Sequence, residues 1–209
     1  MNKRCYIAGA GEFCSEVLPE QGDYVIAADG GFESLTSHGI TPNLVVGDFD
    51  SLGSVPEHPN VILSPVQKDD TDMMLAVRYG LEHGYKTFVI NGGLGGRLDQ
   101  TLANIQILAY IAENDARGTL YGQGVCVTAI KNGKIEFGPD MIKGATISMF
   151  SAGGRAMGVT LTGLKYPLDN ATLTSDYPIG VSNEFTGAPA VVSVRSGTLV
   201  IIWERQKLE

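Results

Sequence analysis

The stretch TFVINGGLGGRLD, residues 87–99, predicts the fold of the first half of the chain. Its apolar run Thr87–Asn91 indicates a buried strand, and a glycine-rich turn then leads into a helix expected over Asp99–Asn114. Alternation of strands and helices also fills the preceding sequence, which is typical of a parallel sheet with helices on its faces. The sequence therefore predicts an α/β N-terminal domain with a mostly parallel sheet over residues 1–130.

The other elements of this domain follow from short apolar runs and from the residues that end helices. Further strands are expected over residues 4–8, 24–28, 44–46 and 61–64. Helices are expected over 32–38 and 72–83, each followed by a glycine, and Thr71 is placed as the N-cap of the second. The helix over Asp99–Asn114 should bury a stripe formed by Leu102, Ile105, Leu108 and Ile111.

The chain changes character after Gly118, where short strands and turn residues replace helical periodicity. The pair Asn132-Gly133 predicts a two-residue hairpin between strands over 125–130 and 135–137. Ser196-Gly197 predicts a second hairpin, between 190–195 and 198–204. We expect a smaller all-β, sandwich-like C-terminal domain over residues 131–209, with Trp203 packed in its core.

Composition and charge exclude several classes of protein. The 209 residues carry a formal net charge of −8 and the 15 basic residues form no run, which argues against a nucleic-acid partner. The three cysteines have no metal-ligand spacing, which favours buried thiols in a reducing compartment. The sequence shows no secretory signal segment, and no apolar stretch approaches the ~20 residues that span a bilayer. We therefore expect a cytoplasmic protein with no membrane partner.

Acidic residues follow three of the predicted strands and open one predicted helix. The four segments are 28–31 (ADGG), 47–51 (GDFDS), 69–72 (DDTD) and 95–99 (GGRLD). Because the carboxyl ends of parallel strands share one edge of a sheet, these carboxylates should converge there. Clustered carboxylates suit Mg²⁺, whose remaining ligands are usually substrate phosphates. The pattern predicts an enzyme that acts on a phosphorylated cosubstrate.

Two segments could also contact phosphate oxygens directly. The turn after Asn91 offers backbone N–H groups at its glycines, and Arg97 offers a planar bidentate donor. The helix that starts at Asp72 offers N–H groups and the Thr71 hydroxyl, with Lys68 close in sequence. Each segment also has a plainer interpretation: a tight turn, acids that complement a helix dipole, or a solvated lysine. The chain has no GxxxxGK[ST] motif, which excludes a Walker-type nucleotide site.

In their order and spacing, these motifs resemble those of the thiamine pyrophosphokinase family. The resemblance rests on AADGG, VVGDFDS, KDDTDMMLAV and NGGLGGRLDQTLANI in the first domain, and on GLKYPLDNATL and GVSNEF in the second. It implies an enzyme that transfers the pyrophosphoryl group of ATP to the thiamine hydroxyl and releases AMP. It also implies Mg²⁺ as cofactor, an ATP- and Mg²⁺-binding first domain, a thiamine-binding second domain, and a homodimer with the active site between subunits.

The same resemblance implies the roles of individual residues. The Mg²⁺ ligands would be Asp48, Asp50 and Asp72. Asp29 and Arg97 would line the nucleotide site. From the residues themselves, further candidates for nucleotide contacts are Gly30, Lys68, Thr71, Gly93 and Gly95; Lys68 departs from the family pattern, since some relatives carry glutamine there. The transfer step would involve Asp72, Arg97 and Asp99, with Asp72 or Asp99 accepting the alcohol proton, and the thiamine pyrimidine would meet Ser182 and Asn183. Two alternatives stay open: the same chemistry on another hydroxymethyl heterocycle such as a pterin, or a non-catalytic nucleotide-binding sensor.

Overall fold

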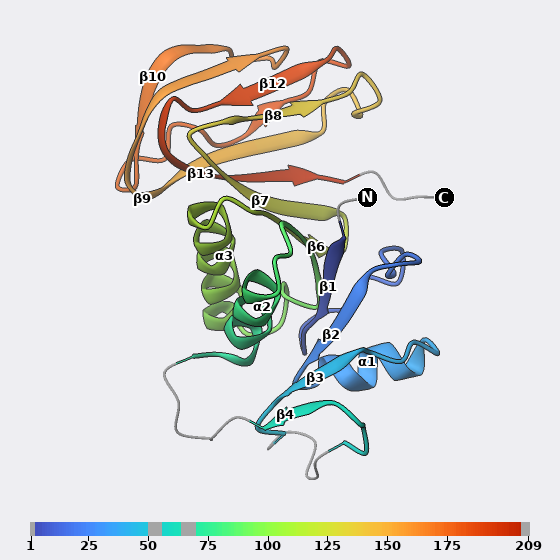
Figure 1. Ribbon diagram of the computed structural model, residues 1–209. Coiled ribbons are helices and arrows are strands. Elements are labelled where there is room, and N and C mark those ends of the chain that lie inside the picture. The colour runs from blue at the N-terminus through green and yellow to red at the C-terminus, as the bar shows by residue number, and fades with distance from the viewer. Residues whose placement is uncertain (1–2, 50–55, 64–69, 206–209) are drawn as a thin grey trace. The chain divides into compact units, whose positions relative to one another are not determined.

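The computed structural model describes residues 3–49, 56–63 and 70–205 (Figure 1). Most of the regular structure in these ranges is β-strand, accompanied by three helices, α1 to α3. The chain separates into two compact units, of which the first comprises residues 1–107 and 118–123. The second comprises residues 108–117 and 124–209. No helix in the described ranges is both long and apolar enough to cross a membrane.

A parallel sheet forms the centre of the first unit. Strand β1 (Arg4–Ala8) lies between β2 (Tyr24–Ala28) and β5 (Thr87–Asn91), parallel to both. Strands β3 (Leu44–Gly47) and β4 (Val61–Leu63) extend the sheet beyond β2, again in parallel. The predicted parallel pairing is therefore present, and within the described ranges the expected strands match to one residue.

The strand order β4-β3-β2-β1-β5 changes direction at β1. From β1 the chain adds β2, β3 and β4 on one side, and it then returns to place β5 on the other side. Strand β6 (Arg117–Gly122) follows β5 in the order. Connections that leave neighbouring strands in opposite directions open a crevice at the carboxyl ends of those strands. In this sheet the crevice is expected just after Ala8 and Asn91.

Helices α1 and α2 cover opposite faces of this sheet (Figure 1). Helix α1 (Gly31–Ser37) packs through Leu35 into a buried cluster formed with side chains of β1, β2 and β3. Helix α2 (Asp72–Glu82) packs on the other face, where a Cβ added at Gly80 would lie 2.5 Å from the ring of Phe88. Both faces of the sheet are thus covered, as a parallel sheet requires.

Helix α3 (Leu98–Glu113) begins one residue earlier than predicted, and its N-terminal part buries a different face from the predicted one. Leu108 and Ile111 are buried as expected, but the side of the helix that carries Leu102 is open, and this residue is 57% exposed. Asn104 is buried instead. Because successive helical residues are rotated by about 100°, positions 102 and 104 lie on nearly opposite sides. The predicted apolar stripe is therefore wrong at its N-terminal end, where the buried side chain is polar.

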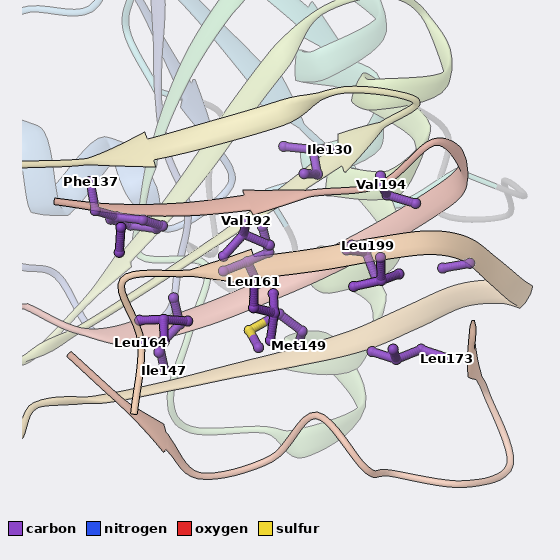
Figure 2. Packing of buried hydrophobic residues seen from close by; sticks show 14 of the residues in the cluster. Ile130, Phe137, Ile147, Met149, Leu161, Leu164, Leu173, Val192, Val194 and Leu199 are labelled. Atoms are coloured by element: carbon purple, nitrogen blue, oxygen red, sulfur yellow. The ribbon is translucent and has the colours of Figure 1, made fainter. Parts of the chain in front are cut away.

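The second unit is built from antiparallel ladders around one apolar core. Its ladders join β7 to β13, β13 to β9, β12 to β8, and β9 to β10, β11 and β12. The strands are β7 (Val125–Lys131), β8 (Lys134–Phe137), β9 (Thr146–Thr162), β10 (Leu168–Thr174), β11 (Asn183–Glu184), β12 (Ala190–Ser193) and β13 (Ser196–Glu204). Figure 2 shows the core, in which Met149 and Leu161 lie close together. Trp203 packs against this core as predicted, its ring 5.4 Å from that of Phe137.

Neither predicted hairpin forms. Strand β7 pairs with β13 and β8 pairs with β12, so the two segments expected to fold back on themselves pair with each other. Their turns are joined by hydrogen bonds: Asn132 N–H donates to the Gly197 carbonyl (3.1 Å), and Gly197 N–H donates to Asn132 Oδ1 (2.8 Å). Both residues have the positive φ that hairpin turns favour, 46° and 105°. Here neither turn closes a hairpin. Instead, the two turns lie side by side and bend the antiparallel pairing that runs from β7–β13 to β8–β12.

Strand β9 bends along with this ladder. It is 17 residues long and pairs with β13 through residues 147–152 and with β12 through residues 160–162. Between these two sections Gly153 and Gly154 have φ of 79° and 105°, which glycine adopts at little cost. Bends of this kind let antiparallel strands turn a corner and pass around a core.

We predict that Asn132→Gly lowers the free energy of unfolding by about 1 kcal/mol, because it keeps the positive φ but removes the bond to Gly197. Asn132→Ala loses both features and should cost about 2 kcal/mol. Asn170→Gly, at another asparagine with positive φ (47°), is the matched control and should have a smaller effect. Denaturant unfolding measures all three, and an Asn132→Gly protein as stable as the wild type would contradict the role of the bond between the turns.

Candidate active site

A cavity of about 470 Å³ opens in the first unit at the carboxyl edge of the sheet. Its lining comes from the turn after β1, the end of β2, the start of α2, and the turn after β5 with the first turns of α3. These residues are Gly9, Ala10, Gly11, Ala28, Asp29, Thr71, Asp72, Met73, Gly92, Gly93, Gly95, Gly96, Arg97, Gln100 and Asn104. The cavity therefore lies at the switch point between β1 and β5, where the strand order predicts a crevice.

The backbones of the two turns are in direct contact. Gly9 N–H donates to the Asn91 carbonyl (2.8 Å), and Gly11 N–H donates to the Gly92 carbonyl (2.7 Å). Gly92 has φ of 69°, and a Cβ there would lie 2.3 Å from the Gly9 carbonyl oxygen. A Cβ at Gly9 would lie 2.7 Å from the Gly92 carbonyl oxygen. Glycine is therefore required on both sides of the contact.

The side chain of Asn91, the last residue of β5, attaches the loop after β1. This side chain is fully buried; its Oδ1 accepts from Cys14 N–H (2.8 Å) and its Nδ2 donates to the Tyr6 hydroxyl (2.9 Å). Nδ2 also lies 2.9 Å from the Cys14 carbonyl oxygen, an acceptor. Burial raises the pKa of Tyr6 to about 12, so its hydroxyl stays protonated at neutral pH. One border of the cavity is thus fixed to β5 through a buried side chain.

Left-handed backbone occurs at two of the acidic segments. Asp29, directly after β2, has φ of 48°, and its N–H donates to the Val46 carbonyl (2.9 Å). Phe49, between Asp48 and Asp50 in the sequence, has φ of 57° and is buried. This conformation is rare for a bulky residue and costs free energy, and such strain clusters at functional sites. Aspartate tolerates this φ, so the strain lies at Phe49, and we associate it with the position of the acidic residues on either side of Phe49 in the sequence.

Most of the predicted nucleotide-site and catalytic residues line the cavity, namely Asp29, Thr71, Asp72, Gly93, Gly95 and Arg97. The predicted N-cap of α2 is confirmed, because Thr71 Oγ1 accepts from Met74 N–H at 3.2 Å. Gly30 is the N-cap of α1, and Asp48 is half-buried directly after β3.

Two predicted residues, Asp50 and Lys68, lie outside the described ranges. Among the residues that are described, no three acidic, cysteine or histidine side chains group closely enough to hold a metal ion. Two of the three predicted ligands, Asp48 and Asp72, are described, and Asp29 follows a neighbouring strand. Carboxylate oxygens of this kind are chemically suited to Mg²⁺.

Arg97 and Asp99 form an ion pair at the exposed start of α3. Arg97 donates to both carboxylate oxygens, at 3.2 Å from Nε and 2.6 Å from Nη2. These hydrogen bonds lower the pKa of Asp99 and raise the pKa of Arg97. Arg97 lines the cavity, whereas Asp99 is not among the lining residues. An exposed pair contributes little to stability, so Arg97 can exchange Asp99 for another anion at small cost.

The two residues predicted to meet thiamine belong to the second unit and differ from each other. Ser182 is exposed with φ of 59°, and its N–H donates to Ser148 Oγ (3.0 Å). Asn183 is buried; its Oδ1 accepts from Tyr166 N–H (3.0 Å) and its Nδ2 donates to the Tyr166 carbonyl (2.7 Å). Ser182 is thus accessible, while the amide of Asn183 holds Tyr166 in place.

Some cavity residues are not found by the sequence-based argument. The turn Gly9–Gly11 is one: its two glycines directly after a strand are a signal for close backbone approach, but they form only half of a dinucleotide-binding fingerprint, so the sequence did not assign them to the site. Met73 is another, because its spacing indicated only an apolar helix face. Gln100 and Asn104 were missed as well. Their signal is spacing, since Arg97, Gln100 and Asn104 recur at intervals of three and four and so share one face of α3.

A glycine-lined crevice at the switch point of a parallel sheet, bordered by carboxylates and a helix N-terminus, defines a class: α/β proteins that bind nucleotides or other phosphates. Residues 16–120 match the family model described as thiamin pyrophosphokinase, catalytic domain. Residues 133–199 match the model described as thiamin pyrophosphokinase, vitamin B1 binding domain.

Individual relatives agree with both family models. The thiamine pyrophosphokinase of Bacillus subtilis (strain 168) is 30% identical over 183 residues, 85% of each chain. A crystal structure of thiamine pyrophosphokinase from Bacillus subtilis is similar with a TM-score of 0.83 and 27% identity, over 98% of this chain and 100% of that one. The structure from Candida albicans, at 17% identity and TM-score 0.78 over 98% and 90% of the two chains, shows the shared fold alone. The chain belongs to the thiamine pyrophosphokinase family, whose members are transferases.

We predict that Gly92→Ala lowers the free energy of unfolding by about 3 kcal/mol or more, because the new Cβ meets the Gly9 carbonyl and φ is positive. Gly96→Ala is the matched control in the same turn, since Gly96 also has positive φ (62°) but nothing within 4 Å of a Cβ. It should cost about 1 kcal/mol. Denaturant unfolding compares the two, and equal losses would show that the contact between the turns does not stabilise the fold.

Proposed function

We propose that this protein transfers the pyrophosphoryl group of ATP to the hydroxyl of thiamine, giving thiamine diphosphate and AMP. The main support for this proposal is that Asp29, Asp72 and Arg97 line the same cavity as the glycine turn after β5. Pyrophosphoryl transfer needs in-line placement and charge neutralisation more than a covalent nucleophile, and the lining supplies groups for both. The match of residues 133–199 to a vitamin B1 binding domain favours thiamine over a pterin as acceptor.

The cavity residues have distinct proposed roles toward ATP. Backbone N–H groups of the turn around Gly93 and Gly95, the Thr71 hydroxyl and Arg97 would contact phosphate oxygens, with Lys68 as a further cation and Asp29-Gly30 beside the nucleotide. Mg²⁺ would be held by Asp48, Asp50 and Asp72, and when bound it neutralises phosphate charge. The strained backbone at Phe49, between Asp48 and Asp50 in the sequence, supports this assignment of the acidic segments.

We assign Asp99 as the acceptor of the thiamine hydroxyl proton. A carboxylate that ligates a metal is a weak base, which disfavours Asp72. Asp99 is also a weak base while it is paired, because Arg97 lowers its pKa. When Arg97 turns to a phosphate, this pKa rises toward its ordinary value and the carboxylate becomes a better proton acceptor. The exposed pair would therefore couple phosphate binding to activation of the alcohol.

The second unit would supply the thiamine site. Ser182 is the candidate for direct contact with the pyrimidine, and Asn183 would support it through its hydrogen bonds to Tyr166. A serine with positive φ is unusual, which supports a functional role for Ser182. We propose residues 1–130 as the ATP- and Mg²⁺-binding domain and residues 131–209 as a sandwich-like thiamine-binding domain.

We further propose a homodimer whose active site lies between subunits. Exposed apolar side chains of the second unit support this. Tyr177, Ile179 and Val181 shortly precede Ser182 in the sequence, and Tyr166 is hydrogen-bonded to Asn183; these four are between 45% and 67% exposed. Apolar surface of this kind is typical of contacts between proteins. Sedimentation of the purified protein measures the oligomeric state.

The test of the reaction is incubation of the purified protein with ATP, Mg²⁺ and thiamine, followed by detection of AMP and thiamine diphosphate. We expect both products from the wild type and a loss of about a hundredfold or more in kcat/KM for Asp72→Asn. Glu82→Gln, at the exposed far end of α2, is the matched control and should be near wild type. Formation of ADP, or equal activity of Asp72→Asn, would contradict the proposal.

Ser182→Gly should separate stability from function. Glycine relieves the positive φ, so the free energy of unfolding should stay the same or rise by up to about 1 kcal/mol. Loss of the hydroxyl should raise the thiamine KM by about tenfold without changing the ATP KM. Asp115→Gly is the control, since it relieves positive φ (53°) elsewhere in the second unit and should leave both KM values unchanged. A larger effect on the ATP KM would place Ser182 outside the thiamine site.

A further inference from the structure

One residue that lines the cavity carries a buried polar atom with no hydrogen-bond partner among the described residues. Asn104, on α3, is 7% exposed and lines the cavity. Its Nδ2 donates to the Gly93 carbonyl at 2.8 Å. Its Oδ1 is buried and makes no hydrogen bond to any part of the chain that the structure describes. A buried acceptor left unpaired is costly, so a native site that keeps one calls for an explanation.

The orientation of this amide follows from chemistry. The Gly93 carbonyl can only accept, so the nitrogen of Asn104 must face it and the oxygen must be the unpaired atom. The backbone at Gly93 packs closely against Leu120, since a Cβ added to Gly93 would lie only 2.4 Å from Leu120 Cδ2. Since Asn104 is tied to a backbone that packs closely, its Oδ1 is a fixed acceptor.

The polar face of α3 changes along its length from charged and exposed to neutral and buried. Arg97 and Gln100 are exposed, whereas Asn104 is buried. Seven residues of helix separate Arg97 from Asn104, a rise of about 10 Å. This distance is comparable to that between the phosphates and the sugar or base of a nucleotide. A nucleotide whose phosphates meet Arg97 would therefore place its neutral part near Asn104.

We propose that Asn104 Oδ1 determines nucleotide specificity by accepting a hydrogen bond from a neutral donor of the nucleoside. The donor is either the exocyclic amino group of adenine or a ribose hydroxyl, and both are neutral donors that a fixed amide oxygen can accept. This inference rests on the proposed function, because it requires that the cavity hold ATP. It assigns Asn104 to substrate binding rather than to the transfer step.

The experiment measures the Kd of Mg²⁺ complexes of ATP, ITP, 2′-deoxy-ATP and 3′-deoxy-ATP by calorimetry, without thiamine. ITP replaces the exocyclic amino group, and each deoxy analogue lacks one hydroxyl. The wild type should bind one analogue about tenfold more weakly than ATP. Asn104→Leu should abolish this ratio, because it removes the acceptor. Asn104→Asp keeps an acceptor oxygen but loses the donor that bonds the Gly93 carbonyl, so it should reduce the ratio without abolishing it.

The ratio of Kd values is insensitive to partial loss of folded protein, so it separates specificity from stability. Equal binding of all four nucleotides by the wild type would overturn the inference, as would an Asn104→Leu protein that keeps the wild-type ratio. Should neither variant fold, a structure of the wild type with bound nucleotide decides, with a donor within ~3.2 Å of Asn104 Oδ1 supporting the inference and its absence refuting it. Failure of the proposed function is distinct, since the wild type would then form no AMP or would not bind ATP.

Discussion

The turns after β1 and β5 meet backbone to backbone, and the candidate site depends on this contact. Gly92 and Gly9 approach so closely that a Cβ on either would meet the carbonyl oxygen of the other. The contact lies where the strand order reverses, so the carboxyl edge of the sheet opens beside it. Because the glycines of both turns lack side chains there, their backbones border the cavity and a ligand can approach them closely. The same contact thus closes the fold and shapes the cavity.

Strained backbone in this protein is concentrated next to the residues with proposed functions. Asparagine and aspartate tolerate positive φ, so Asn132 and Asp115 need no special explanation. Phenylalanine and serine do not share this tolerance. Phe49 stands between two acidic residues in the sequence, and Ser182 stands in the segment proposed to bind thiamine. The surrounding structure must hold both residues in a backbone conformation that they disfavour. This cost in stability supports a functional reason for their positions.

Elements with a local signal could be predicted from the sequence. Strand β5 and the N-cap of α2 were found because an apolar run and a threonine before a helix are local patterns. Strand pairing was not found in the second unit, because Asn132-Gly133 specifies a turn but not which strands pair beside it. The share of Gly9–Gly11 in the cavity was missed for a similar reason, since the partners of these glycines lie some 80 residues away in the sequence. Asn104 was missed because helical periodicity favours leucine as the buried residue, and a polar cavity wall reverses that preference.

We propose that the cavity at the β1–β5 switch point holds the phosphates of ATP together with a divalent ion. The decisive experiment is a crystal structure of the protein soaked with Mg²⁺ and a non-hydrolysable ATP analogue. We expect phosphate oxygens against the backbone of the turn at Gly92–Gly96 and a metal ion contacted by Asp48 and Asp72. A nucleotide bound elsewhere, with this cavity filled only by water, would contradict it.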